Sequence, residues 1–246
     1  MNLPNAARRL RAAFSYFTIL PVGAADAPDA ATLAWLPFVG AVVGALAGFA
    51  ALGVAHVSTH AFAVATAFVV PIVLTGAMHV DGFLDGCDAF FASVPPARRL
   101  EILKDPRHGT FALAGFAVVG TLWLAALWSI DPATYPLALA FSGAAARWSS
   151  VIHALYVPYG RAGELTRAFE QRPSRGVLAL GLVLVAALAF ALGTLGLVAF
   201  AAGVALAALC IAWTRSRLGG GLTGDAYGFT TVVAELAALV ALSAWR

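Results

Sequence analysis

Long apolar stretches separated by short polar segments are the main pattern of this chain. Seven stretches approach the roughly 20 apolar residues that a helix needs to cross the hydrocarbon core of a bilayer. A helix also satisfies its own backbone hydrogen bonds where water is absent. The seven predicted crossings are 35–54, 61–78, 111–130, 135–157, 177–192, 196–213 and 229–245.

The fifth and sixth stretches form one uninterrupted apolar run. We divide this run at Gly193-Thr194-Leu195-Gly196 because it is longer than one bilayer crossing. A re-entrant hairpin at the same place would instead remove both crossings. The pattern as a whole therefore predicts about seven transmembrane helices, with the least support for the fifth and sixth.

Composition agrees with a membrane protein. Hydrophobic residues make up 61% of the chain and charged residues only 11%, too few charges to cover a soluble globule. No repeat, low-complexity tract or linker is visible. We therefore expect an all-α, polytopic membrane bundle in which residues 1–246 form a single domain.

The basic residues predict the orientation of this bundle. All but two of the 15 Lys and Arg residues precede the first crossing or lie in the connections 79–110, 158–176 and 214–228. Cytoplasmic connections carry the excess of Lys and Arg. We therefore expect a cytoplasmic N-terminus and an external C-terminus. Topology accounts for the net charge of +3, which gives no support for nucleic-acid binding.

Residues 1–25 superficially resemble a signal peptide, with an Arg-rich start followed by an apolar stretch. Ser15, Thr18 and Pro21 weaken that stretch. A retained amphipathic helix that lies in the membrane interface explains the same residues, and we favour it.

An acidic motif begins where the second predicted crossing ends. At about 100° per residue, Asp81, Asp85 and Asp88 fall within roughly 60° of one another on a helix. Carboxylates so close repel unless a cation neutralises them, and oxygen ligands suit Mg²⁺, which also holds substrate phosphates. Alternatively, Asp81-Gly82 and Asp85-Gly86 mark a solvated turn. Unpaired charge beside an apolar span is costly, which favours the metal site.

Two further polar segments could complete this site. Lys104 and Arg107 could bind phosphate oxygens, although a basic cytoplasmic loop is also the ordinary topological pattern. The glycine-rich segment 219–228 could present backbone N–H groups to an anion, and Asp225 within it could bind the metal or accept a proton. A flexible turn accounts for these glycines about as well.

Arg147 and Glu235 lie inside predicted crossings, where ionisable side chains usually face a partner or a polar cavity. We expect them to pair with each other. An ion path of a transporter is the alternative, which is disfavoured because the densest charges lie at the membrane surface.

Together these segments resemble the cobalamin synthase family, membrane enzymes also called adenosylcobinamide-GDP ribazoletransferases. The resemblance covers most of the chain and rests on segments 17–21, 36–40 with Gly44, 79–88, 101–110 and 220–225. The acidic motif and the Lys-Asp-x-Arg-x-Gly-Thr motif are its specific part. His108 and Cys87 occupy positions that we regard as variable, and Gly219 leaves the alignment of the glycine segment uncertain by one residue.

The resemblance implies a Mg²⁺-dependent transfer late in vitamin B12 synthesis. Adenosylcobinamide-GDP would react with α-ribazole or its 5′-phosphate to give adenosylcobalamin or its 5′-phosphate, with release of GMP. The implied partners are these substrates and membrane lipid, in a bacterial inner membrane with the active site on the cytoplasmic side.

The resemblance also implies roles for individual residues. Asp81, Asp85 and Asp88 would hold Mg²⁺, and Asp225 would be a further ligand or the general base. The substrate-binding candidates are His79, Glu101, Lys104, Asp105, Arg107, Gly220, Gly221, Thr223 and Gly224.

Other membrane transferases that use carboxylate-bound metal on a diphosphate fit less well. The CDP-alcohol phosphotransferase pattern is absent, because Leu84-Asp85 stands where that pattern requires Ala-Arg. The paired Asn-Asp-x-x-Asp motifs of prenyltransferases are also missing.

Overall fold

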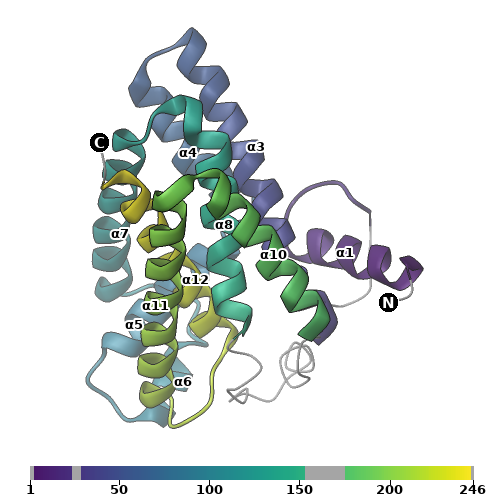
Figure 1. The fold of residues 1–246 in the computed structure, drawn as a ribbon. Coiled ribbons are helices and arrows are strands. Elements are labelled where there is room, and N and C mark those ends of the chain that lie inside the picture. Colours follow the sequence, from purple (N-terminus) through teal and green to yellow (C-terminus); the bar gives the residue numbers. More distant parts are fainter. Residues whose placement is uncertain (1–2, 24–28, 153–174, 245–246) are drawn as a thin grey trace.

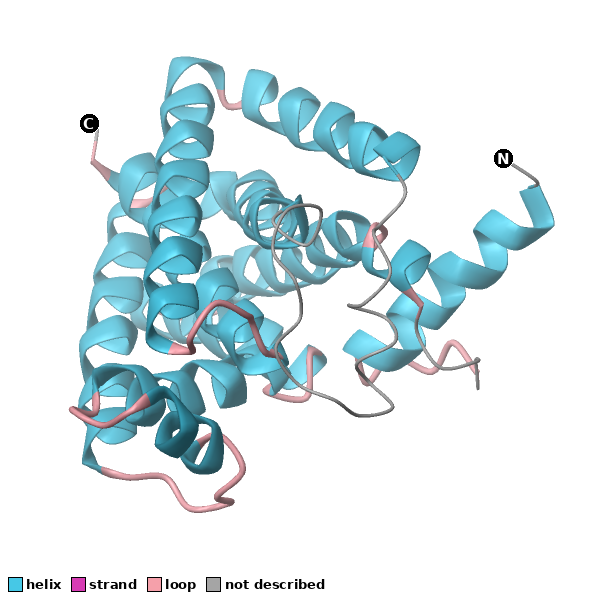
Figure 2. Cartoon of the chain, turned by 90° about the horizontal axis from the view of Figure 1, so that it is seen from below, coloured by secondary structure: helices cyan, strands magenta, loops and turns pink. Residues whose placement is uncertain are grey.

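The computed structural model describes residues 3–23, 29–152 and 175–244, and every regular element in these ranges is a helix (Figures 1 and 2). The predicted all-α class is confirmed. The elements are α1 (Leu3–Phe17), α2 (Ala30–Leu33), α3 (Leu36–Val57), α4 (His60–Leu74), α5 (Met78–Phe91), α6 (Pro96–Ile102), α7 (Thr110–Ser129), the 3-10 turn η1 (Pro132–Thr134), α8 (Tyr135–Ile152), α10 (Arg175–Ala191), α11 (Gly193–Arg217) and α12 (Gly224–Ser243).

Four helices in the described ranges are long and apolar enough to cross a membrane: Ala31–Val57, Thr110–Ser129, Gly193–Arg217 and Gly224–Ser243. The count rises to five if α4 and α5, which are bent by 90° from each other, form one broken span. The chain is thus a helical membrane protein. The count of seven crossings and the cytoplasmic N-terminus remain predictions.

The helix α8 is buried along nearly its whole length, in contrast to the lipid-facing helices. It packs against α3, α12, α10 and α11. Glycines on α3 allow the closest of these contacts, because a Cβ atom on Gly44 would lie 2.0 Å from the carbonyl oxygen of Leu139. Small residues are the usual means by which membrane helices bring their backbones together.

The division of the long apolar run is confirmed. The helix α10 ends at Ala191 and α11 begins at Gly193, whose φ of +67° is a left-handed conformation that glycine adopts without strain. The second helix starts three residues earlier than predicted. Of the basic connection 158–176, Arg161, Arg167 and Arg172 lie outside the described residues.

The predicted connection 79–110 is largely helical, and the helix assumed for the acidic motif is present. The connection contains α5 and α6, which lie at the lower end of the bundle in Figure 1. The helix forms because its other face is apolar: Phe83 stacks on Phe229 of α12, and Phe90 meets the same ring edge-on. Since α5 is sharply bent from α4 and carries three aspartates, we place it outside the membrane-spanning segments.

The amphipathic N-terminal helix is present as α1, which stands apart from the main bundle in Figure 1. Ala13 and Phe17 bury its apolar face in a small second core, together with Val39 and Val43 of α3. Arg8 and Arg11 remain exposed on the opposite face. This arrangement is typical of a helix that lies along a membrane surface.

Candidate active site

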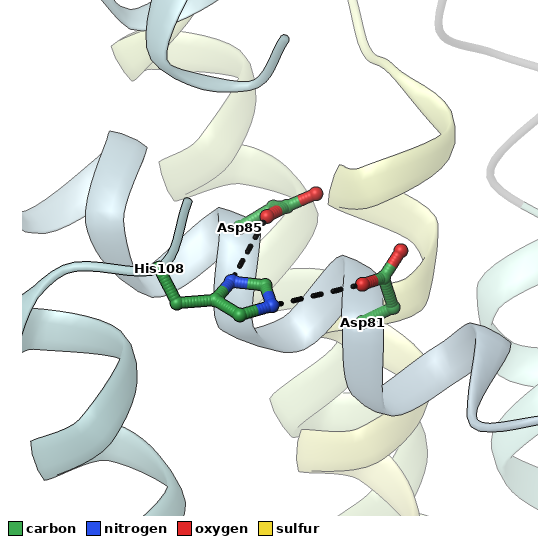
Figure 3. Close-up of side chains that lie close together, drawn as sticks. All are labelled: Asp81, Asp85 and His108. Carbon is green, nitrogen blue, oxygen red and sulfur yellow. Dashed lines mark ion pairs between the residues drawn. The ribbon is translucent and has the colours of Figure 1, made fainter. Parts of the chain in front are cut away.

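Two carboxylates of α5 and one imidazole form the centre of the site. Asp81 and Asp85 lie one turn apart, and His108 reaches between them from the loop before α7 (Figure 3). Its Nε2 is 3.9 Å from Oδ1 of Asp81, and its Nδ1 is 3.5 Å from Oδ1 of Asp85. One ligand atom of each residue lies within 4.8 Å of the others, so the three could hold a metal ion.

Asp88 is used differently from the other two aspartates. Its two carboxylate oxygens accept hydrogen bonds from the backbone N–H groups of Gly109 and of Ala112, the latter at 3.0 Å. These groups belong to the N-terminus of α7, where Gly109 has no side chain that could cap the helix. Asp88 therefore caps α7 and lies outside the group formed by Asp81, Asp85 and His108. Its predicted role as a metal ligand remains a prediction.

Asp225 is brought to this site by the contact between α5 and α12. It lies in the first turn of α12, whose N-cap Thr223 accepts a hydrogen bond from the N–H of Ala226 at 3.3 Å. A Cβ atom on Gly82 would lie 3.2 Å from the Cα of Asp225, and one on Gly228 would lie 3.2 Å from the Cα of Gly82. The two glycines thus let the helices meet closely enough to place Asp225 beside α5.

The neighbouring carboxylates raise the proton affinity of Asp85. Burial, followed by the charges of Asp81 and Asp225, raises the pKa of Asp85 to about 6, and His108 offsets part of this effect. A carboxyl group in such surroundings ionises fully only when a positive charge compensates it. The site therefore has the electrostatics expected of a cation site.

The predicted phosphate ligands lie in the loop that carries His108. The side chain of Lys104 is exposed. Arg107 binds Asp105 through two hydrogen bonds of 2.8 Å, from Nε to Oδ1 and from Nη2 to Oδ2. These hydrogen bonds, more than the charge of Arg107, lower the pKa of Asp105 to about 2. A phosphate that binds Arg107 would have to share or replace this partner.

The glycine segment forms the turn from α11 to α12. Gly219 and Gly220 have φ angles of +79° and +118°, and Nε of Arg215 donates to the carbonyl oxygen of Gly220 at 3.0 Å. Gly221 follows in the same turn, and Gly224 begins α12. The positive φ angles of the turn explain why Gly219 and Gly220 are glycines. The anion-binding role of the segment stays a prediction.

Two other candidates occupy different surroundings. Glu101 pairs with Arg98 at 2.5 Å on the exposed side of α6. His79 is the second residue of α5, two residues before Asp81. Its Nδ1 atom is shielded from solvent and has no hydrogen-bond partner in the described part of the chain.

The pairing predicted for the intramembrane charges is confirmed. Nη1 of Arg147 on α8 lies 3.4 Å from Oε2 of Glu235 on α12, and both side chains are almost fully buried. A hydrogen bond of 2.8 Å between Ser150 and Thr231 joins the same two helices. These contacts hold α12, which carries Asp225, against the central helix.

Sequence reasoning missed three contributors to the site. His108 was set aside as variable, although its place between the acidic helix and the start of α7 was a usable signal. Arg99 donates to the carbonyl oxygen of Ala92 at 3.0 Å, and Arg217 donates to those of Phe90 and Ala92 at 2.8 Å. The two arginines thus bind the carbonyl groups at the end of α5. The distribution of Lys and Arg along the sequence had explained these two residues only by membrane topology.

Comparison with known proteins points to one family. A family model described as cobalamin-5-phosphate synthase matches residues 9–243. Curated proteins named adenosylcobinamide-GDP ribazoletransferase include one from Desulforamulus reducens, 32% identical with 89% of each chain covered. Another, from Leptothrix cholodnii, is 35% identical, with 96% of this chain and 95% of the relative covered. No solved structure matches.

Proposed function

Because the chain belongs to the cobalamin-5-phosphate synthase family, we propose that it is an adenosylcobinamide-GDP ribazoletransferase. It transfers the phosphocobinamide group of adenosylcobinamide-GDP to a hydroxyl group of α-ribazole or α-ribazole 5′-phosphate. The products are adenosylcobalamin or its 5′-phosphate, and GMP. The observation that carries this proposal is that the family match includes the residues that α5, α12 and the loop before α7 bring together.

The donor set of the site fits a divalent cation, and we propose that it is Mg²⁺, held by Asp81, Asp85 and Asp88, with His108 nearby. Carboxylate oxygens are the ligands that Mg²⁺ prefers. The raised pKa of Asp85 supports this, because the crowded carboxylates need a counter-charge. Bound there, Mg²⁺ would neutralise the diphosphate of the substrate and polarise the phosphoryl group under attack.

In this transfer the residues of the chain have to accept a proton and to bind phosphate oxygens. The acceptor hydroxyl oxygen forms a bond to the β-phosphorus that carries cobinamide, the bond from that phosphorus to the oxygen of GMP breaks, and the hydroxyl proton must leave. Asp225, beside Asp85, is the candidate that accepts this proton or completes the metal site. Lys104 and Arg107 are the candidates that bind phosphate oxygens.

The remaining candidates fit around this centre. The backbone of Gly220, Gly221 and Gly224, with Thr223, would contact the substrate where α12 begins, since N–H groups at a helix start favour anions. His79, Glu101 and Asp105 are retained as substrate-binding candidates from the motif alone.

We further propose that the protein lies in the bacterial inner membrane with this site on the cytoplasmic side. The basic residues Arg99, Lys104, Arg107 and Arg217 surround the same end of the bundle, which supports this orientation. Adenosylcobinamide-GDP and α-ribazole or its phosphate would reach the site from the cytoplasm.

The proposal is tested by incubating the detergent-solubilised protein with adenosylcobinamide-GDP, α-ribazole and Mg²⁺, and measuring GMP and the corrinoid product. We expect both products in equal amounts, none in EDTA, and none with Asp81→Asn. GMP release without a corrinoid product would show hydrolysis, and no release under any condition would contradict the proposed activity.

A further inference from the structure

The loop that carries His108 is held on both sides of the imidazole. On one side, the N–H of Arg107 donates to Oδ1 of Asp105 at 3.1 Å. On the other, the N–H of Gly109 donates to Asp88 of α5. A Cβ atom on Gly109 would lie 2.8 Å from the same carboxylate, so a larger residue there would displace the side chain of Asp88. The backbone on either side of His108 is thus tied down.

The two ring nitrogens of His108 face two different carboxylates, Nε2 toward Asp81 and Nδ1 toward Asp85 (Figure 3). This is the environment in which imidazole commonly binds a metal. One ring nitrogen and one oxygen of each carboxylate lie within 4.8 Å of one another, so all three side chains can reach a single ion. The side chain of His108 is about one-third exposed, at 37%, so an ion can reach it from solvent.

A nitrogen ligand changes which ions a site prefers. Mg²⁺ strongly favours oxygen ligands and keeps several waters, whereas imidazole suits first-row transition ions. An Asp-Asp-His site therefore differs from the site of three carboxylates that the sequence suggested.

We propose that His108 is a direct metal ligand and that it makes this site bind transition ions such as Co²⁺ and Mn²⁺ more tightly than Mg²⁺. The inference rests on the proposed function only in taking the site to be metal-dependent. Mg²⁺, as the more abundant ion, would still support turnover, because the ion present in a cell depends on availability as well as affinity.

The test measures metal binding rather than turnover. The protein in detergent is stripped with EDTA, dialysed, and titrated calorimetrically with Co²⁺ and separately with Mg²⁺, with no substrate present. We expect the wild type to bind Co²⁺ at least about tenfold more tightly than Mg²⁺. His108→Asn should weaken Co²⁺ binding by about 10- to 100-fold and leave Mg²⁺ binding within about threefold.

Two variants separate ligation from other effects. His108→Asp supplies an oxygen in place of the nitrogen, so it should keep Mg²⁺ binding and lose the preference for Co²⁺. His60→Asn is the matched control. His60 is the first residue of α4, and its Nε2 contacts the carbonyl oxygen of Trp128 on α7 and no carboxylate of the site. The variant should bind both ions as the wild type does.

Pulsed EPR of bound Mn²⁺ identifies the ligand directly. The wild type should show modulation from a histidine nitrogen, which His108→Asn should abolish. No nitrogen modulation in the wild type would overturn the proposal, and so would modulation that survives in His108→Asn or equal losses of Co²⁺ and Mg²⁺ affinity. A protein that shows the expected binding but forms no GMP would contradict the proposed function and leave the role of His108 intact.

Discussion

At the scale of single residues, the site is defined by charges that are costly to bring together. Asp85 is far more buried than Asp81: its side chain is 19% exposed, against 67% for Asp81. Its neighbours Asp81 and Asp225 add negative charge, and His108 offsets part of their effect. Stability and function therefore make opposite demands on this carboxyl group.

Asp85→Asn should stabilise the metal-free protein while it abolishes most turnover. Because the pKa of Asp85 is raised to about 6 in the fold, the folded state favours the protonated form. The resulting stabilisation is present below the unfolded pKa near 4 and is lost as the pH rises through about 6. Above that pH, the charged form costs on the order of 2 kcal/mol, which asparagine avoids.

Thermal unfolding in EDTA measures this effect. The Tm of Asp85→Asn should exceed that of the wild type at pH 7.5, and the difference should shrink at pH 5. Added divalent metal should raise the Tm of the wild type alone, since it binds only the intact site. A difference that does not change with pH would show that charge crowding is not its cause.

Arg107→Ala should lower kcat/KM for adenosylcobinamide-GDP by more than about tenfold, a loss of about 1.4 kcal/mol in transition-state stabilisation. The reason is that Arg107 lies one residue before His108 and is exposed toward solvent, where a diphosphate can reach it. Arg98→Ala is the control, since Arg98 is equally basic but pairs with Glu101 on α6. If steady-state kinetics gave equal losses for both variants, general loop charge would be the cause.

At the scale of elements, the helix α5 is positioned by backbone contacts at both of its ends. Glycines 82 and 228 let it meet α12 near its start, and Arg99 and Arg217 bind its last carbonyl groups. Asp88 joins it to α7. The acidic helix is therefore held by α12, α7 and the end of α11, and the spacing of the site depends on these contacts.

Gly82→Ala should reduce turnover with little effect on the amount of protein inserted. The new Cβ atom would lie 3.2 Å from the Cα of Asp225 and 3.3 Å from that of Gly228, so α12 would have to shift by a few tenths of an ångström. Small displacements of catalytic groups are costly, and we expect about a tenfold loss in kcat.

Gly53→Ala is the matched control, because a Cβ atom there meets nothing within 4 Å. It should keep full activity and gain up to about 1 kcal/mol of stability, since alanine favours helix over glycine. Steady-state kinetics and thermal unfolding of both variants check the pair. Full activity in Gly82→Ala would mean that the distance between α5 and α12 is not critical.

At the scale of the whole molecule, two groups of charged side chains stand out. One is at the end of the bundle where α5, α6 and the starts of α7 and α12 lie (Figure 1). The other is in the interior, where Arg147 and Glu235 neutralise each other. The lipid-facing surface carries apolar side chains such as Phe49, Phe62 and Phe190. This distribution supports the proposed position of the active site at one membrane surface.

The orientation can be tested with single cysteines introduced into a variant that lacks Cys87 and Cys210. Cysteines at Arg98 and Arg217 should react with a membrane-impermeant thiol reagent only after the cytoplasmic side is exposed. A cysteine at Asp131, which the helix α7 separates from Arg98, should react from outside intact cells. Labelling of Arg98 and Asp131 from the same side would show that α7 does not cross the membrane.

Local features of the chain predicted much of this molecule. The high mean hydropathy of single segments predicts membrane helices, because the burial of an apolar segment in lipid depends on its own composition and not on the other helices that it contacts. The break at Gly193 followed from length alone. The pairing of Arg147 with Glu235 was predictable because an unpaired charge in an apolar interior is costly. The adjacency of Asp81 and Asp85 followed from the helical period.

Only the tertiary structure decided which groups share the site. The helical period placed Asp88 with the other two aspartates, but α7 starts beside it and its carboxylate binds the N–H groups there. The same packing brings His108, distant along the chain, between Asp81 and Asp85. Asp225 joins them because Gly82 and Gly228 let two helices touch. Periodicity describes one helix at a time, whereas these contacts depend on how closely separate helices pack.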